Sequence, residues 1–143
     1  MSYIYPTNLK HTVMLVKTFG SAVFGINAAT ITIEADVTKG IKFLLVGLPD
    51  NAVKESQQRI ESALRIIGFR WPKQKIVINM APADLRKEGS YFDLPMAVWI
   101  LAASEQIKPD RLEKFEMKGE LSLDGTLQTV RGIFHPFLFQ YQQ

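Results

Sequence analysis

The sequence predicts an α/β domain in which three strands, a helix, a strand, a second helix and a β-hairpin follow one another. Apolar and polar residues alternate over Thr30–Val37, which is typical of a half-buried strand. From Val53 to Ile67 apolar residues recur at helical spacing. Asp124-Gly125 separates two later strand patterns and favours a tight hairpin. The chain has 143 residues, 47% of them hydrophobic, enough for one domain with its own core.

The first half of the chain is punctuated by residues that favour turns and helix ends. Lys39 and Gly40 predict a short turn, since glycine readily takes a positive φ. Ile41–Val46 is almost continuously apolar, so we expect a strand at the centre of the sheet. A helix should begin at Asp50, whose carboxylate can accept an unpaired backbone N–H. Gly68 is the expected end of that helix.

The second half predicts a further strand and a buried helix separated by a polar loop. The strand covers Lys75–Met80, and the loop covers Ala81–Gly89. Ser90 and Asp93 fit the S-x-x-D pattern of a helix start, so we expect Ser90 to cap the helix. Asp93 is the alternative cap, since Pro95 would then lie in the first turn. The helix should run to about Gln106, and its apolar residues predict burial on several sides.

The hairpin strands and the domain boundaries complete the predicted organisation. Phe115–Leu123 and Thr126–Arg131 read as the two hairpin strands. Residues 1–13 lack periodicity and are interpreted as an N-terminal extension. The domain itself is expected over residues 14–132, with an atypical C-terminal tail over 133–143.

Positive charge is concentrated in one part of the chain. The net charge is +3, from 17 basic and 14 acidic residues. The segment Phe69–Glu88 holds five basic and two acidic residues, so the rest is balanced at twelve of each. Such a cluster can favour phosphate groups, but the charge alone points more to an ordinary solvated surface. The candidate anion- or nucleic-acid-binding residues are Lys73, Lys75, Arg86, Lys87 and Ser90, the last at a helix N-terminus.

Several chemistries lack their sequence signatures. The chain has no cysteine, and its two histidines lie far apart, so no metal site is expected. Neither a phosphate-binding P-loop nor a dinucleotide-binding glycine motif occurs, so no cofactor is expected on this chain. The longest apolar run, Met96–Ala103, is too short to span a bilayer, and no secretory signal is visible. We therefore expect a cytoplasmic protein without membrane contact.

Three runs of sequence carry a resemblance to a known family: "FLLVGLPDNAVKESQQRIESAL", "INMAPADLRKEGSYFDLPMA" and "GELSLDGTLQTVRG". In order and spacing they resemble the N-terminal domain of the ComM-type Mg-chelatase-like proteins, over about Met14 to Gly132. The resemblance implies the two-layer fold of the Lon proteolytic domain, with a β-β-β-α-β-α core and a left-handed crossover. Such crossovers depart from the usual handedness rule.

The family also implies a function. Its members are AAA+ ring ATPases linked to DNA processing and natural transformation, in which this domain precedes the ATPase module. ATP and magnesium are then expected only on that module. Past Gly132 the family continues with an alanine-rich helix, whereas this chain has Pro136 among aromatic residues. We therefore expect the product of a truncated or frame-shifted gene, with an uncovered apolar face, and hence a homo-oligomer.

The resemblance to Lon also raises the possibility of a peptidase, which needs a serine nucleophile and a lysine. The nucleophile position of the Lon motif holds Tyr91 here, and Ser90 lies one position away. No lysine follows Lys118, although the Lon base should lie near Gly132. We expect a non-enzymatic domain for subunit assembly and weak DNA contact. The alternatives are a degenerate serine peptidase using Ser90, and a structural module or gene remnant without its own activity.

Overall fold

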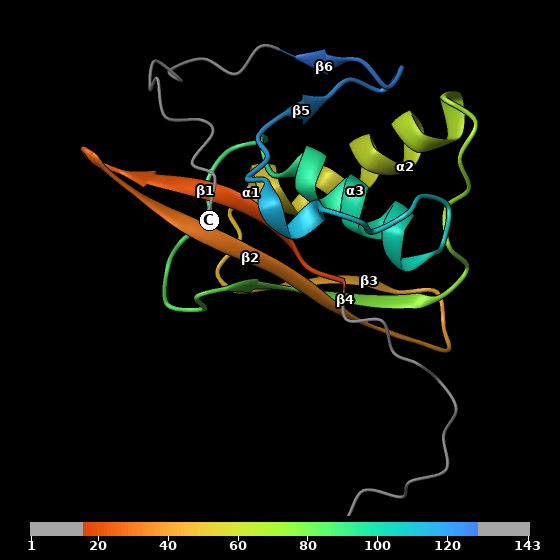
Figure 1. Ribbon diagram of the computed structural model, residues 1–143, viewed down its shortest axis with the longest axis horizontal. Helices are drawn as coiled ribbons and strands as arrows, with labels where there is room; N and C mark the ends of the chain where they lie inside the picture. The colour runs from red at the N-terminus through yellow and green to blue at the C-terminus, as the bar shows by residue number, and fades with distance from the viewer. Residues whose placement is uncertain (1–15, 129–143) are drawn as a thin grey trace, which may run out of the picture.

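A computed structural model describes residues 16–128 of the chain (Figure 1). The extension over residues 1–13 and the tail over 133–143 lie outside the described residues. The elements in chain order are β1 (Thr18–Phe24), β2 (Asn27–Thr38), β3 (Phe43–Val46), α1 (Asn51–Lys54), α2 (Ser56–Ile66), β4 (Lys75–Ala81), α3 (Asp93–Ala103), a 3₁₀ turn (Leu112–Lys114), β5 (Glu120–Leu121) and β6 (Leu127–Gln128).

The four long strands form one mixed sheet in the order β1-β2-β4-β3. The β1–β2 and β2–β4 pairs are antiparallel, whereas β3 and β4 are parallel. Helices α2 and α3 lie together over one face of the sheet, and β5 and β6 lie beyond them (Figure 1). A mixed α/β fold with the expected order of elements is therefore confirmed. The Lon-like assignment, the left-handed crossover and the truncation stay predictions.

The alternating pattern of β2 is confirmed. Ile31 and Ile33 are fully buried on the face toward the helices, while Thr30 and Asp36 are exposed. Ile33 lies opposite Met80 of β4, which is also fully buried. One strand thus places its apolar face in the core because successive side chains point to opposite sides of the sheet.

The position expected for the strand over Ile41–Val46 is wrong: β3 is an edge strand, and it begins only at Phe43. After the helices the chain returns as β4, which inserts between β2 and β3. Leu44 and Val46 lie on the face of the sheet away from the helices, where they are 45% and 49% exposed. An apolar run indicates a strand but does not distinguish a central strand from an edge strand whose outer face is apolar.

The first helix begins as expected but is divided in two. The Asp50 carboxylate accepts the backbone N–H of Val53 at 2.8 Å, which confirms the N-cap. The helix then breaks at Glu55, so that α1 is one short turn and α2 carries the apolar face. Gly68 has a φ of 95°, and the N–H of Phe69 returns to the carbonyl of Leu64 at 2.8 Å. This left-handed residue ends the helix as predicted.

The second helix, α3, is buried on several sides as predicted, although two details differ. It ends at Ala103 rather than near Gln106. The predicted Ser90 cap is wrong, because no side chain caps α3 and the Ser90 hydroxyl donates to the carboxylate of Glu120 instead. The backbone between Ser90 and Asp93 forms a turn before the helix starts, so Phe92 and not Ser90 occupies the N-cap position.

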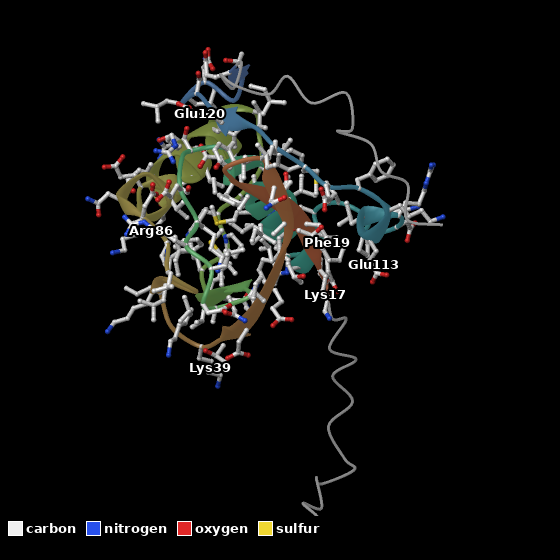
Figure 2. All side chains as sticks on the ribbon, turned by 90° about the vertical axis from the view of Figure 1, so that its left-hand side faces the viewer. Lys17, Phe19, Lys39, Arg86, Glu113 and Glu120 are labelled. Atoms are coloured by element: carbon white, nitrogen blue, oxygen red, sulfur yellow. The ribbon has the colours of Figure 1, made fainter. Side chains whose placement is uncertain are left out.

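The first arm of the hairpin after α3 is shorter than predicted, and part of it has another role, while residues 129–131 of the second arm lie outside the described residues. Strands β5 and β6 pair with each other around the turn at Gly125. Before β5, the chain runs along the outer edge of β1: Glu116 bridges Phe19, and the N–H of Met117 donates to the Phe19 carbonyl at 2.7 Å. Phe19 is labelled at this edge in Figure 2. Within residues 16–128, no helix is long and apolar enough to cross a membrane.

Candidate functional site

The ends of the parallel strands β3 and β4 bring the two most distinctive loops together. We call Gly47–Asp50 and Pro82–Ser90 the loop clamp. The N–H of Asp50 donates to the Lys87 carbonyl at 2.9 Å, and the N–H of Lys87 donates to the Leu48 carbonyl at 3.0 Å. The other carboxylate oxygen of Asp50 accepts the N–H of Gly89 at 3.0 Å. Asp50 therefore holds both the start of α1 and the second loop.

Lys87 lies inside the loop clamp rather than on its surface. Its side chain is fully buried, and its ammonium group donates to the carbonyl of Pro82. Removal from water disfavours the charged form and lowers the pKa of Lys87, while nearby Asp84 acts in the opposite direction. The lysine that the sequence favours for phosphate contact is thus enclosed by the chain, where it supports the loop instead of reaching a ligand.

The buried ammonium predicts a specific pH dependence of stability. Between the lowered pKa of folded Lys87 and its ordinary value of 10.5, the unfolded chain binds more protons than the folded chain. Stability therefore rises as pH increases through this window, and the burial penalty is present in full below it. Relative to Lys87→Met, the wild type should gain free energy of unfolding as pH approaches 10.5.

Urea unfolding of both proteins at several pH values between about 7 and 10.5 measures this difference. Comparing the two proteins cancels the other groups that titrate nearby. Burial raises the pKa of Tyr91 and lowers that of Lys118, and both groups remain in the variant. A difference that stays constant over this range would contradict the assignment of Lys87 as a buried ammonium.

The other two candidates of this loop have partners of their own. Arg86 pairs with Glu88 at 3.1 Å, and both side chains are 68% exposed, so the pair is weak and Arg86 can turn to another anion. Figure 2 shows Arg86 at the surface. Ser90 donates its hydroxyl to Glu120, and neither Lys87 nor Lys118 has a hydrogen bond to it within the described residues. This arrangement gives no support to the serine–lysine peptidase alternative.

A buried ion pair beside the loop clamp was missed by the sequence analysis. Asp93 is fully buried and binds Arg59 of α2 through two contacts, Nε–Oδ2 at 2.7 Å and Nη2–Oδ1 at 3.0 Å. The same carboxylate accepts the N–H of Leu121 in β5 at 3.0 Å. The hydrogen bond to Asp93 raises the pKa of Arg59, against the lowering effect of burial. Asp93 therefore ties α2, α3 and β5 together.

The remaining candidates, Lys73 and Lys75, lie at the opposite end of β4 from Arg86. Lys75 is the first residue of the strand, and Ala81 is its last, so about 20 Å of extended chain separates the two ends. The structure thus does not bring the five predicted residues into one site. It divides them between the loop clamp and the start of β4.

Two further lysines, Lys39 and Lys42 of the β2–β3 turn, lie near the start of β4. Thr38 lies opposite Lys75, and the Lys42 carbonyl accepts the N–H of Ile76 at 2.8 Å. The β2–β3 turn therefore stands beside the start of β4, and Figure 2 shows Lys39 at the surface, well apart from Arg86. We call the four residues the lysine cluster: Lys39, Lys42, Lys73 and Lys75. All but the half-buried Lys75 are exposed, and within residues 16–128 none forms a salt bridge.

These features define the class of the protein: a two-layer α/β domain with interlocked strand-end loops and a basic opposite end. Within the described part of the chain, no group of three or more acidic, histidine or cysteine residues is placed to hold a metal ion. The hydrogen bonds of the loop clamp and the ion pair of Asp93 join helices, strands and loops to one another, so we assign them a role in stabilising the fold.

Comparison with known proteins identifies the family. The model of subunit ChlI of Mg-chelatase matches residues 33–143. Competence protein ComM of Haemophilus influenzae is 46% identical over 121 residues, which are 84% of this chain and 24% of ComM. YifB of Escherichia coli is 48% identical over 112 residues, 78% of this chain and 22% of YifB. The chain belongs to the ComM-type Mg-chelatase-like family, and it spans less than a quarter of the length of these relatives.

Proposed function

We propose that the chain acts as the non-catalytic N-terminal domain of a DNA-processing AAA+ ring ATPase, where it contributes subunit contacts and weak nucleic-acid contact. The family membership supports this proposal, and the name of ComM links a relative to competence. In this proposal ATP and magnesium bind to the ATPase module and not to this domain. The name Mg-chelatase refers to the relatedness of the ATPase modules. Nothing in the described residues supports insertion of metal into a porphyrin.

The lysine cluster is the observation that carries nucleic-acid contact. Four ammonium groups from two chain segments stand at one end of the sheet without an acidic partner within salt-bridge distance among the described residues. Long, hydrated lysine side chains suit a sequence-independent contact with phosphates, whose strength comes from the release of counterions. Arg86 adds a further exposed positive charge, although about 20 Å of strand lies between it and the cluster.

The proposal is tested by fluorescence anisotropy with labelled single-stranded and duplex DNA over a salt series. Four phosphate contacts should make log affinity fall against log salt with a slope of roughly −3 for single strands. Absence of binding even at low salt would contradict the nucleic-acid part of the proposal. The chain would then be an assembly module, or a remnant without activity of its own.

A further inference from the structure

A half-buried tryptophan lies at the same end of the sheet as the lysine cluster. Trp71 belongs to the connection between α2 and β4, which Figure 1 shows on the right-hand side, where β2 turns into β3. The centroid of its ring is 5.5 Å from that of Phe43, the first residue of β3. The two rings are tilted by 51°, so they do not stack parallel to one another. Trp71 keeps part of its surface in water, although a large aromatic side chain gains most from complete burial.

Positive charges flank this aromatic pair along the chain. Lys42 directly precedes Phe43, and Arg70 and Lys73 lie within two positions of Trp71. All three basic side chains are exposed, and among residues 16–128 none of them forms a salt bridge. Two of them, Lys42 and Lys73, are members of the lysine cluster. The indole and free positive charges therefore share one end of the domain.

The chain on either side of Trp71 is held in place. The Gln106 side chain, just beyond α3, accepts the N–H of Arg70 at 2.8 Å and donates to the Arg70 carbonyl at 2.8 Å. Pro72 follows Trp71, and its ring restricts the backbone there. A side chain whose backbone is already fixed loses less conformational freedom when a ligand binds. The position of the indole is thus preorganised for contact with a ligand.

An aromatic ring among lysines matches the chemistry of an unpaired nucleic-acid strand. Proteins that bind single strands without sequence preference combine basic residues along the phosphates with aromatic side chains on which bases stack. Every base has an aromatic face, so such a contact tolerates any sequence. In a duplex the base faces are covered by neighbouring base pairs, and only the phosphates remain for the lysines.

We propose that Trp71 is a base-stacking contact, and that with the lysine cluster it forms a binding site for single-stranded nucleic acid. This inference deepens the nucleic-acid part of the proposed function and rests on it. The lysines bind phosphates of any strand, whereas the indole distinguishes an unpaired base from a base pair. A duplex therefore binds through the lysines alone and with lower affinity.

Trp71→Leu in the full 143-residue chain separates stacking from charge. Leucine keeps an apolar side chain against Phe43 but cannot stack on a base. Affinity for labelled oligothymidine, measured by fluorescence anisotropy, should fall about tenfold, while affinity for a duplex of the same length stays unchanged. The salt slope should keep its wild-type value because no charge is removed. Trp71→Phe, which retains an aromatic ring, should preserve most of the binding, and circular dichroism checks that both variants are folded.

Tryptophan fluorescence tests the contact without changing Trp71. The chain has two tryptophans, and Trp99 is only 3% exposed in the core, where its indole N–H donates to the Val16 carbonyl at 2.8 Å. In Trp99→Phe, Trp71 is the single reporter. Unlabelled oligothymidine should quench its emission and saturate at the affinity that anisotropy gives, and a duplex should quench it far less. Trp71→Leu is the control, since the emission of the remaining Trp99 should not respond.

Two results would overturn this inference while leaving the lysines as phosphate contacts. The first is binding of oligothymidine that neither quenches Trp71 nor is weakened by Trp71→Leu. The second is equal affinity and equal quenching for the single strand and the duplex. Absence of binding to either nucleic acid at low salt is a different outcome, because it removes the nucleic-acid part of the proposed function and this inference with it.

Discussion

Asp93→Ala is expected to lower the free energy of unfolding by about 3–5 kcal/mol, because it leaves a largely buried guanidinium without its counter-charge. The Asp93 side chain is 0% exposed and that of Arg59 is 17% exposed. Removal of the carboxylate also deprives the N–H of Leu121 of its acceptor. Both losses occur where α2, α3 and β5 meet, so the effect should spread over the helical layer. Urea unfolding followed by circular dichroism measures it.

The matched control is Glu55→Ala, which removes the other acidic partner of Arg59. This pair is longer, at 3.7 Å, and the Glu55 side chain is 70% exposed. Solvent screens such pairs, so the change should be below about 1 kcal/mol. If the two variants lost similar stability, Asp93 would not be the residue that holds these elements together.

Gly47→Ala is expected to lower the free energy of unfolding by about 2–5 kcal/mol, through backbone strain together with overpacking. Gly47 has a φ of 105°, a conformation that residues with a side chain rarely adopt. A Cβ there would lie 2.3 Å from the Met80 carbonyl oxygen and 3.3 Å from the Lys87 ammonium nitrogen. Because the obstacle is the backbone of β4, it cannot move aside without disturbing the sheet.

Gly25→Ala separates the two causes. Gly25, between β1 and β2, also has a positive φ, of 58°, but no atom lies within 4 Å of the position of an added Cβ. Gly25→Ala should lower the free energy of unfolding by about 1 kcal/mol, from backbone strain alone. Thermal unfolding of both variants gives the comparison, and equal losses would mean that the close contact beneath Gly47 is absent in solution.

Much of the fold could be predicted because local patterns decide it. The alternation in β2, the N-cap at Asp50 and the glycine that ends α2 each depend on neighbours within a few residues. The order of strands across the sheet depends on where β4 inserts, and nothing in the local sequence of β3 reports that. The apolar Leu44 and Val46 were for this reason attributed to a central strand, although they lie at the edge.

The candidate site could be predicted only in part, because side-chain roles depend on long-range contacts. From the sequence, Lys87 and Arg86 are both expected to be surface charges. In the structure Lys87 is buried and only Arg86 is exposed. Asp93 resembles a capping residue, but its partner Arg59 is 34 positions away. Lys39 was not included because the turn that carries it is far in sequence from Lys75, although the sheet register places the two segments together.

The most direct test of the nucleic-acid contact is the salt dependence of DNA binding in two matched double variants. Lys39→Ala with Lys73→Ala removes two charges from the lysine cluster, whereas Lys54→Ala with Lys114→Ala removes two exposed lysines elsewhere. The cluster variant should have a single-strand slope shallower than wild type by roughly 1.4, and the control should keep the wild-type slope. Equal slopes in the two variants would show that phosphates do not bind at the lysine cluster.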